Sequence, residues 1–513
     1  MISIRAFILV IVVLWQVLPG IAQNEDVKYD YNWYLGYAGS TGLPKFGPSI
    51  LSFDEEEVFV STGNHVNMNF SETNITISDA YGNITFYSNG AYVFDASHSL
   101  MQGGDTLSPS EYTTDKYIVG HYLPQGVLAL PHPGDDSKWH LFHNYAAINQ
   151  TGIAVVAPEK FHSTIDMTLN GGLGAVNNAN EVFLSGEFST RENTACRHAN
   201  GRDWWLLFPE IITNKVHRYL LDLDGLHYIG TQEIGEVVMH GLKQAVFSPD
   251  GTTYVRFNTE IAPTYSEVNI FDFDRCTGML SNPINISYEE NFGAGGCEIS
   301  PSSQYLYVSA GNKIFQYDLW SDDIASTLDT VAVYDGGTSN GFPTFFYTCQ
   351  HAPDGKIYIT NTSTVFTIHV IHDPDSAGTA CNVEQQGIEL PYLQEGLPNN
   401  PHYRLGRLVG SACDTIDFTS SVAEIEVEQG VTFYPNPTYG ELQVRLSAPE
   451  VLSRRVAFEL YDMAGRQLYT VPLREAEQSV TLPAVAAGMY VGRVVDAEGA
   501  VIAVEKIVVI GDD

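Results

Sequence analysis

The stretch HAPDGKIYITN, at 351–361, is the third copy of a pattern that decides the fold. The earlier copies are FSPDGTTYVRF at 247–257 and ISPSSQYLYVS at 299–309. The prolines of consecutive copies are 52 residues apart (301 − 249 and 353 − 301). Because proline fixes φ and glycine accepts positive φ, each copy predicts a tight turn between the two strands of a hairpin.

Two further strands are expected after each of these turns. Four strands in a unit of 52 residues are typical of a β-propeller blade. A blade has two apolar faces, and stacking blades in a ring buries both. Weaker turn signals near residues 82, 135 and 201 extend the repeat upstream. The third strands are predicted at 267–274, 313–320 and 366–373, and the fourth strands at 283–288, 329–336 and 382–390.

The number of blades follows from the length of the repeat region. Residues 23–411 are 389 residues (411 − 23 + 1), or about 7.5 units of 52. The sequence therefore predicts an all-β protein with a seven-bladed propeller, six blades being the alternative. N-terminal strands at 32–37 or 49–53 are expected to close the ring with the last blade.

Composition and charge narrow the classes of partner. The chain has 61 Asp and Glu against 25 Lys and Arg, which gives a net charge of −36. A surface this acidic repels phosphate backbones and anionic lipid, so we expect neither nucleic acid nor bare membrane as a partner. A hydrophobic content of 44% is enough for a large core.

The first residues have the pattern of a signal peptide, predicted at 1–22. One arginine precedes the apolar run AFILVIVVLWQVL at 6–18, and small residues follow, with cleavage expected between Ala22 and Gln23. The run is short for a membrane span, and the alternative is an uncleaved anchor. No later stretch is apolar enough, so no transmembrane segment is expected in the mature protein. The six cysteines permit up to three disulfides in an exported chain, and no two of these cysteines have C-x-x-C spacing.

The last part of the chain has a different pattern. Residues 412–430 are polar and acidic and are interpreted as a linker. Residues 431–513 then alternate apolar strands with turns such as Pro435-Asn436-Pro437, which predicts a small immunoglobulin-like β-sandwich.

This tail resembles the C-terminal sorting domain of the type IX (Por) secretion system of Bacteroidetes. The resemblance implies a signal for the outer-membrane translocon, with the protein secreted or attached to the outer-membrane surface, and with the tail often removed after passage. It implies recognition and structural roles for these residues and no catalytic one. The residues that carry the motif are Pro435, Asn436, Pro437, Gly440, Asp462, Gly465, Arg466, Gly488, Tyr490 and Lys506.

The middle of the chain also resembles a known group. Stretches such as RHANGRDWWLL at 197–207 and LPNNPHYRLG at 397–406 look like the WD-like propeller region of large exported and gliding-associated Bacteroidetes proteins. This resemblance covers about 30–413 and supports the propeller. It implies no established activity.

Candidate metal ligands are confined to two Asp-x-Asp pairs, Asp222/Asp224 and Asp272/Asp274. Alternation along a strand would place both carboxylates of a pair on one face, where Ca²⁺ could bind. The competing interpretation is a repeat feature that caps a strand, because an apolar residue followed by Asp recurs at 94–95, 165–166, 221–222, 271–272 and 317–318. His140 and His143 are expected on opposite faces of a strand, and His198 and His351 just before blade turns.

The sequence contains no Gly-x-Ser-x-Gly, phosphate loop or His-Glu-x-x-His motif. No catalytic or cofactor-binding residue is therefore predicted. Two classes of function stay open: a binding module for an unknown protein or glycan, and a propeller enzyme (a lactonase, hydrolase or lyase) with its site at the channel mouth. A cluster of titratable residues at one end of the channel would favour the enzyme.

Overall fold

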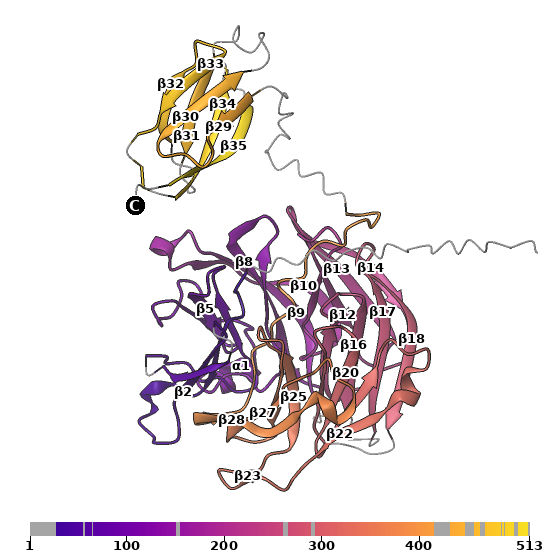
Figure 1. Ribbon diagram of the computed structural model, residues 1–513. Helices are drawn as coiled ribbons and strands as arrows, with labels where there is room; N and C mark the ends of the chain where they lie inside the picture. The colour runs from indigo at the N-terminus through magenta and orange to yellow at the C-terminus, as the bar shows by residue number, and fades with distance from the viewer. Residues whose placement is uncertain are drawn as a thin grey trace, which may run out of the picture. The chain divides into compact units, whose positions relative to one another are not determined.

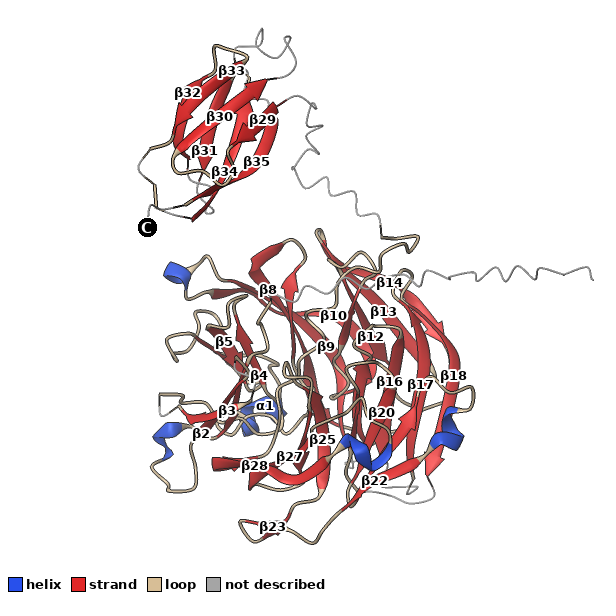
Figure 2. Ribbon diagram, viewed as in Figure 1, coloured by secondary structure: helices blue, strands red, loops and turns tan. Residues whose placement is uncertain are grey.

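A computed structural model describes residues 27–54, 57–63, 65–149, 154–259, 265–288, 293–414, 431–446, 456–461, 467–483, 485–486, 488–496 and 501–510. The chain divides into two compact units, Met1–Asp414 and Thr415–Asp513. The predicted signal peptide with its cleavage position and most of the predicted linker lie outside the described residues. Strands make up nearly all of the regular structure (Figures 1 and 2). Among the described residues no helix combines the length and apolarity needed to cross a membrane.

The described part of the first unit contains seven antiparallel sheets of three or four strands that follow one another in the sequence, numbered here as blades 1 to 7. Blades 1 and 2 have three strands, and blades 3 to 7 have four. Blade 1 comprises β1 (Asn32–Gly36), β2 (Pro48–Ser52) and β3 (Phe59–Thr62); blade 2, β4 (Ile75–Ser78), β5 (Ile84–Ser88) and β6 (Val93–Asp95); blade 3, β7 (Leu128–His132), β8 (Asp135–Ile148), β9 (Val155–Asp166) and β10 (Ala175–Ser189); blade 4, β11 (Ala195–Arg197), β12 (Trp204–Pro209), β13 (Lys215–Asp222) and β14 (Gly225–Glu233).

The last three blades contain the repeats with the clear Pro turns, and their third and fourth strands lie at the predicted positions within a few residues. Blade 5 comprises β15 (Leu242–Phe247), β16 (Thr253–Thr259), β17 (Ser266–Asp274) and β18 (Met279–Tyr288); blade 6, β19 (Gly296–Ile299), β20 (Tyr305–Ala310), β21 (Lys313–Asp318) and β22 (Asp329–Val333); blade 7, β25 (Phe346–His351), β26 (Ile357–Asn361), β27 (Val365–Ile371) and β28 (Val383–Gln394). Between the blades lie the hairpin β23 (Thr338–Ser339) and β24 (Phe342–Pro343) and helix α1 (Glu111–Lys116). Within blades 1, 3, 6 and 7, connections between strands contain 3₁₀ turns at Gly39–Thr41, Asn170–Gly172, Ile324–Thr327 and Gly378–Cys381.

The blades form a ring because each sheet buries both of its faces against its neighbours. A separate buried cluster joins each consecutive pair from blade 4 to blade 7, and one larger cluster joins blades 2, 3 and 4. Trp33 and Leu51 of blade 1 pack against Tyr358 and Ile368 of blade 7, which closes the ring. Tyr34 of blade 1 contacts blade 2 in a further cluster. The seven-bladed prediction is confirmed.

One detail of the ring differs from the prediction. The N-terminal strands β1 and β2 pair with each other, and do not complete the last sheet. Blade 7 already has four strands from its own repeat, so strand pairing with the N-terminus is not needed. The ring closes through side chains instead, with Trp33 fully buried against Phe53 and Tyr358.

The centre of the ring is filled by the segment that follows blade 7, residues 396–408, which we call the plug. The inner strand of each blade is its first strand. The Asn399 amide donates to the carbonyls of Val127 (2.9 Å) and Asn193 (2.8 Å), which lie just before the inner strands β7 and β11 of blades 3 and 4. His402 Nε2 lies 3.0 Å from the Phe247 carbonyl of blade 5, and the Tyr403 hydroxyl donates to the Ala129 carbonyl at 2.8 Å. One segment thus binds inner strands on several sides of the ring.

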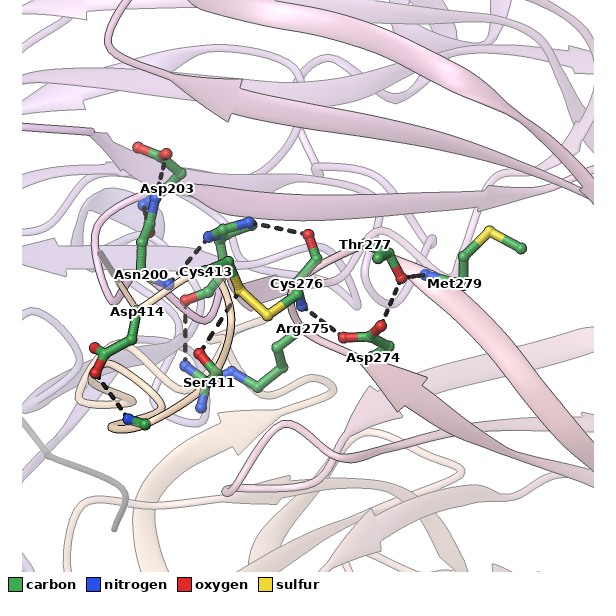
Figure 3. The surroundings of a disulfide bond; sticks show 12 residues. Asn200, Asp203, Asp274, Arg275, Cys276, Thr277, Met279, Ser411, Cys413 and Asp414 are labelled. Carbon is green, nitrogen blue, oxygen red and sulfur yellow. Dashed lines mark hydrogen bonds between the residues drawn. A yellow bond between two sulfur atoms is a disulfide. The ribbon is translucent and has the colours of Figure 1, made fainter. Parts of the chain in front are cut away.

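The chain is held in place at both ends of the plug, by a close backbone contact at Gly396 and by a disulfide at Cys413. Gly396 lies so close to the chain at 71–72 that a Cβ atom would be 2.5 Å from the Ser71 carbonyl oxygen, so only glycine fits there. At the other end, a disulfide joins Cys413 to Cys276 in the turn between β17 and β18 (Figure 3). Arg275 beside it donates to the Gly406 and Arg197 carbonyls. The other four cysteines are buried as free thiols.

The second unit is a two-sheet sandwich. Its described strands form one sheet in the order β29-β30-β33 and another in the order β32-β31-β34-β35. A core that includes Leu442, Phe458 and Ile507 lies between them. The strands are β29 (Val431–Tyr434), β30 (Glu441–Leu446), β31 (Ala457–Tyr461), β32 (Gln467–Pro472), β33 (Glu477–Thr481), β34 (Gly488–Val495) and β35 (Val501–Val509).

Candidate functional site

The four candidate metal ligands lie at the ends of the third strands β13 and β17 or in the turn that follows, and form hydrogen bonds within their own hairpins. Asp222 ends β13, and its Oδ1 accepts the N–H of Asp224 at 2.9 Å, so Asp224 is in a turn and not on the predicted strand face. Asp272 and Asp274 do share an exposed face of β17. However, Asp272 accepts from Asn282, while Asp274 accepts from Cys276 and Thr277. Within the described ranges, no three His, Cys, Asp or Glu side chains are grouped as a metal ion would require.

The recurrent Asp is a turn cap. In blades 2 to 6 a strand-ending aspartate accepts the backbone N–H two residues later, which starts the next turn. In blade 5 this role belongs to Asp274, not to Asp272 as the sequence pattern suggested. The five bonds are Asp95 to Ser97 (2.8 Å), Asp166 to Thr168 (2.9 Å), Asp222 to Asp224 (2.9 Å), Asp274 to Cys276 (2.8 Å) and Asp318 to Trp320 (3.0 Å).

Most of the histidines noted in the sequence are internal. His140 lies between His132 and His162, with ring nitrogens 2.9 and 2.7 Å apart, on one face of blade 3. His143 faces the opposite side and bonds to Ser108 and Ser163. Burial lowers the pKa of His140 to about 3, helped by its two histidine neighbours, so these rings are neutral near pH 7.

Three titratable residues, Glu298, His351 and His402, meet in the channel at the plug. Glu298 of β19 accepts the backbone N–H groups of Ile299 (2.9 Å) and His351 (3.0 Å). The His351 ring packs against His402 of the plug, with centroids 5.5 Å apart. Burial lowers the pKa of His402 to about 4 and raises that of Glu298 to about 7. These groups contact other parts of the chain.

Glu298 predicts a specific pH dependence of stability. The folded protein holds this proton up to about pH 7, whereas an unfolded glutamate releases it near 4.5. The folded state therefore binds more protons in that window, so this group's contribution to stability is full below 4.5 and lost as the pH rises to 7. The loss is about 3 kcal/mol.

We expect Glu298→Gln to flatten the dependence of the unfolding free energy on pH between 5 and 7, measured by urea denaturation. The exposed Glu389→Gln, which makes the same chemical change on β28, should leave the slope as it is. Equal slopes in the wild type and Glu298→Gln would contradict the assignment.

A pocket of about 290 Å³ lies where the chain enters the plug. Its walls come from segments far apart in the sequence: the connections before blades 2 and 3, the β23–β24 hairpin, the β26–β27 turn and the end of blade 7. The lining residues are Glu72, Tyr122, Phe342, Asn361, Thr362, Ser363, Thr364 and Glu395.

Three charged groups determine the electrostatics of this pocket: the Arg191 cation and the carboxylates of Glu72 and Glu395. Arg191, which connects blades 3 and 4, donates to the Tyr347 hydroxyl at 2.8 Å and pairs with Glu72 at 3.4 Å. Burial raises the pKa of Glu72, and the negative charge of Glu395 adds to this, while Arg191 and Tyr347 oppose it. Burial also raises the pKa of Tyr347 to about 12.

Glu395 interacts with two hydroxyl groups of the protein. Its Oε1 accepts the hydroxyl hydrogen of Thr364, and the Tyr37 hydroxyl interacts with both Thr364 and Glu395. Glu395 therefore adds a second carboxylate to the pocket wall, beside Glu72. The sequence analysis did not select Glu72, Arg191 or Glu395, because no motif or spacing links residues brought together by ring closure.

The described residues of the sorting motif lie in two strands of the second unit and in the connection between β29 and β30. Pro435, Asn436, Pro437 and Gly440 lie between β29 and β30, and the Asn436 side chain accepts the Val508 N–H of β35 at 2.9 Å. The Tyr490 hydroxyl of β34 donates to the Ala486 carbonyl at 2.7 Å. Gly488 begins β34 and Lys506 lies in β35. Asp462, Gly465 and Arg466 lie outside the described residues.

The fold thus defines a β-propeller protein that ends in a small immunoglobulin-like sandwich. Residues 432–510 match the family model of the secretion system C-terminal sorting domain. The tail is therefore a type IX (Por) sorting domain, and the protein is exported to the cell surface or released. This result confirms the resemblance inferred from the Pro-Asn-Pro and Gly-x-Tyr motifs.

The comparison with solved structures returns propeller-like proteins at low identity, and no curated protein matches the chain. A proposed 6-phosphogluconolactonase from Bacteroides fragilis is 15% identical, with 72% of this chain and 97% of that chain covered and a TM-score of 0.39. A quinonprotein alcohol dehydrogenase-like protein from Bacteroides thetaiotaomicron is 10% identical, with 72% and 78% covered and a TM-score of 0.35. Hydrazine synthase from Kuenenia stuttgartiensis is 11% identical, with 70% and 95% covered and a TM-score of 0.36.

Proposed function

We propose that the propeller is a binding module that acts outside the cell, on a protein or glycan, after export through its sorting domain. The observation that carries this proposal is the plug. Residues 396–408 fill the centre of the ring, and the acid and imidazole groups gathered there, Glu298, His351 and His402, contact one another or neighbouring backbone groups. This arrangement supports a structural role for the groups that an enzyme of the channel would use.

The test is turnover. The purified full-length protein, assayed against lactones, glycosides and esters, should show only background rates. A turnover number in the ordinary enzyme range of ~1–10³ s⁻¹ would overturn the proposal in favour of a propeller enzyme. In that case Glu72→Gln and Glu298→Gln would separate catalysis at the pocket beside the plug from catalysis inside the channel.

A further inference from the structure

We infer that the pocket beside the plug binds one ring of a neutral carbohydrate, which inserts its hydroxyl groups between Glu72 and Glu395. This inference rests on the proposed binding function and names the ligand class of its site. It is carried by three features of the pocket: its size, the polar residues of its walls and the exposed aromatic rings at its rim.

The size suits a small ligand. Pockets for drug-sized molecules measure about 300–1,000 Å³. The volume here, about 290 Å³, lies at the lower limit of that range. A single sugar ring is therefore a better match than a nucleotide or an extended peptide.

The walls select hydroxyl groups over charged or apolar ligands. Three of the lining residues, Thr362, Ser363 and Thr364, carry side-chain hydroxyls, and the carboxylates of Glu72 and Glu395 are acceptors in the same wall. Arg191 already contacts Glu72 and Tyr347, so the pocket has no unpaired cation for a phosphate or sulfate. Two carboxylates in a chain of net charge −36 also repel anions.

The rim provides apolar contact. Tyr122 and Phe342 line the pocket with 39% and 48% of their surface exposed. Aromatic faces carry negative charge density, which attracts the C–H groups on the face of a sugar ring. Carboxylate acceptors, hydroxyl-bearing residues and exposed aromatic rings together fit a pyranose better than an amine, which would use the carboxylates alone.

The experiment compares ligand classes and two matched variants. The full-length protein is applied to an array of neutral, amine-bearing and anionic glycans, and the affinity for the neutral oligosaccharides that bind is measured by calorimetry. Glu395→Gln keeps the shape of the side chain and removes the charged acceptor, so we expect at least a tenfold loss of affinity. Glu389→Gln, exposed on β28 and outside the pocket, should bind as the wild type does.

Phe342→Ala adds an independent readout, because this exposed ring can be removed without disturbing a core, and it should also weaken binding. Binding confined to amine-bearing glycans, no binding to any glycan, or neutral-glycan binding that Glu395→Gln and Phe342→Ala leave unchanged would each overturn the inference. None of these three results would show catalysis, so each would leave the proposed binding function in place, with a ligand of another class. Turnover on lactones, glycosides or esters would instead overturn that function.

Discussion

Deletion of residues 431–513 should abolish export while the propeller still folds. The deleted residues form a unit with its own core, and the plug, the disulfide and all seven blades lie before residue 415. A folded, highly charged domain has no physical route through a second bilayer without a translocon. In a host with the type IX apparatus, cell fractionation should find the truncated protein inside the outer membrane and none on the surface or in the medium.

Two controls make this result decisive. Residues 431–513 fused to an unrelated periplasmic reporter should carry that reporter outward. Limited proteolysis of the truncated protein should show a resistant core, which separates lost export from misfolding. Arrival of the truncated protein at the surface would mean that the tail is only a structural domain.

Tyr403→Ala should destabilise the propeller by about 3–5 kcal/mol, as for other large buried aromatic side chains. Tyr403 is 1% exposed at the centre of the ring. Its ring contacts Tyr29, Trp139 and Trp204, which belong to different parts of the ring. The cavity would therefore open between several blades at once, and the loss is a large share of the about 5–15 kcal/mol that stabilises a typical domain. Urea denaturation monitored by tryptophan fluorescence measures it.

Tyr403→Phe is the matched control. It keeps the ring and removes only the hydroxyl, which donates to the Ala129 carbonyl, so we expect a loss of about 1 kcal/mol. If Tyr403→Ala cost no more than Tyr403→Phe, the plug would contribute little to holding the blades together.

The local sequence predicted the blades because their turns are local. Six turn signals, near residues 82, 135, 201, 251, 303 and 355, mark the first hairpin of blades 2 to 7. Blade 1 gave no such signal, since its first connection, at 37–47, is long and contains a 3₁₀ turn. The aspartate caps were also predictable, apart from the choice between Asp272 and Asp274, which depends on where β17 ends.

The plug and the pocket were beyond local reasoning. The LPNNPHYRLG stretch carries no strand period, and its position is set by hydrogen bonds to carbonyls of three blades far away in the sequence. The pocket depends on the same long-range closure, because Glu72 and Glu395 are neighbours only after blade 7 packs on blade 1. A sequence pattern shows regular spacing along the chain, whereas these contacts join residues that have no regular spacing in the sequence.

The disulfide also has a mechanical consequence. Any pull on the chain beyond residue 414 enters the propeller at Cys413, the residue joined to Cys276. Tension from a surface attachment would pass through this covalent link into the β17–β18 turn of blade 5, and from there into a four-stranded sheet whose hydrogen bonds share the load. The noncovalent contacts of residues 396–408 would be spared, so the centre of the ring would stay filled while the protein is held under force.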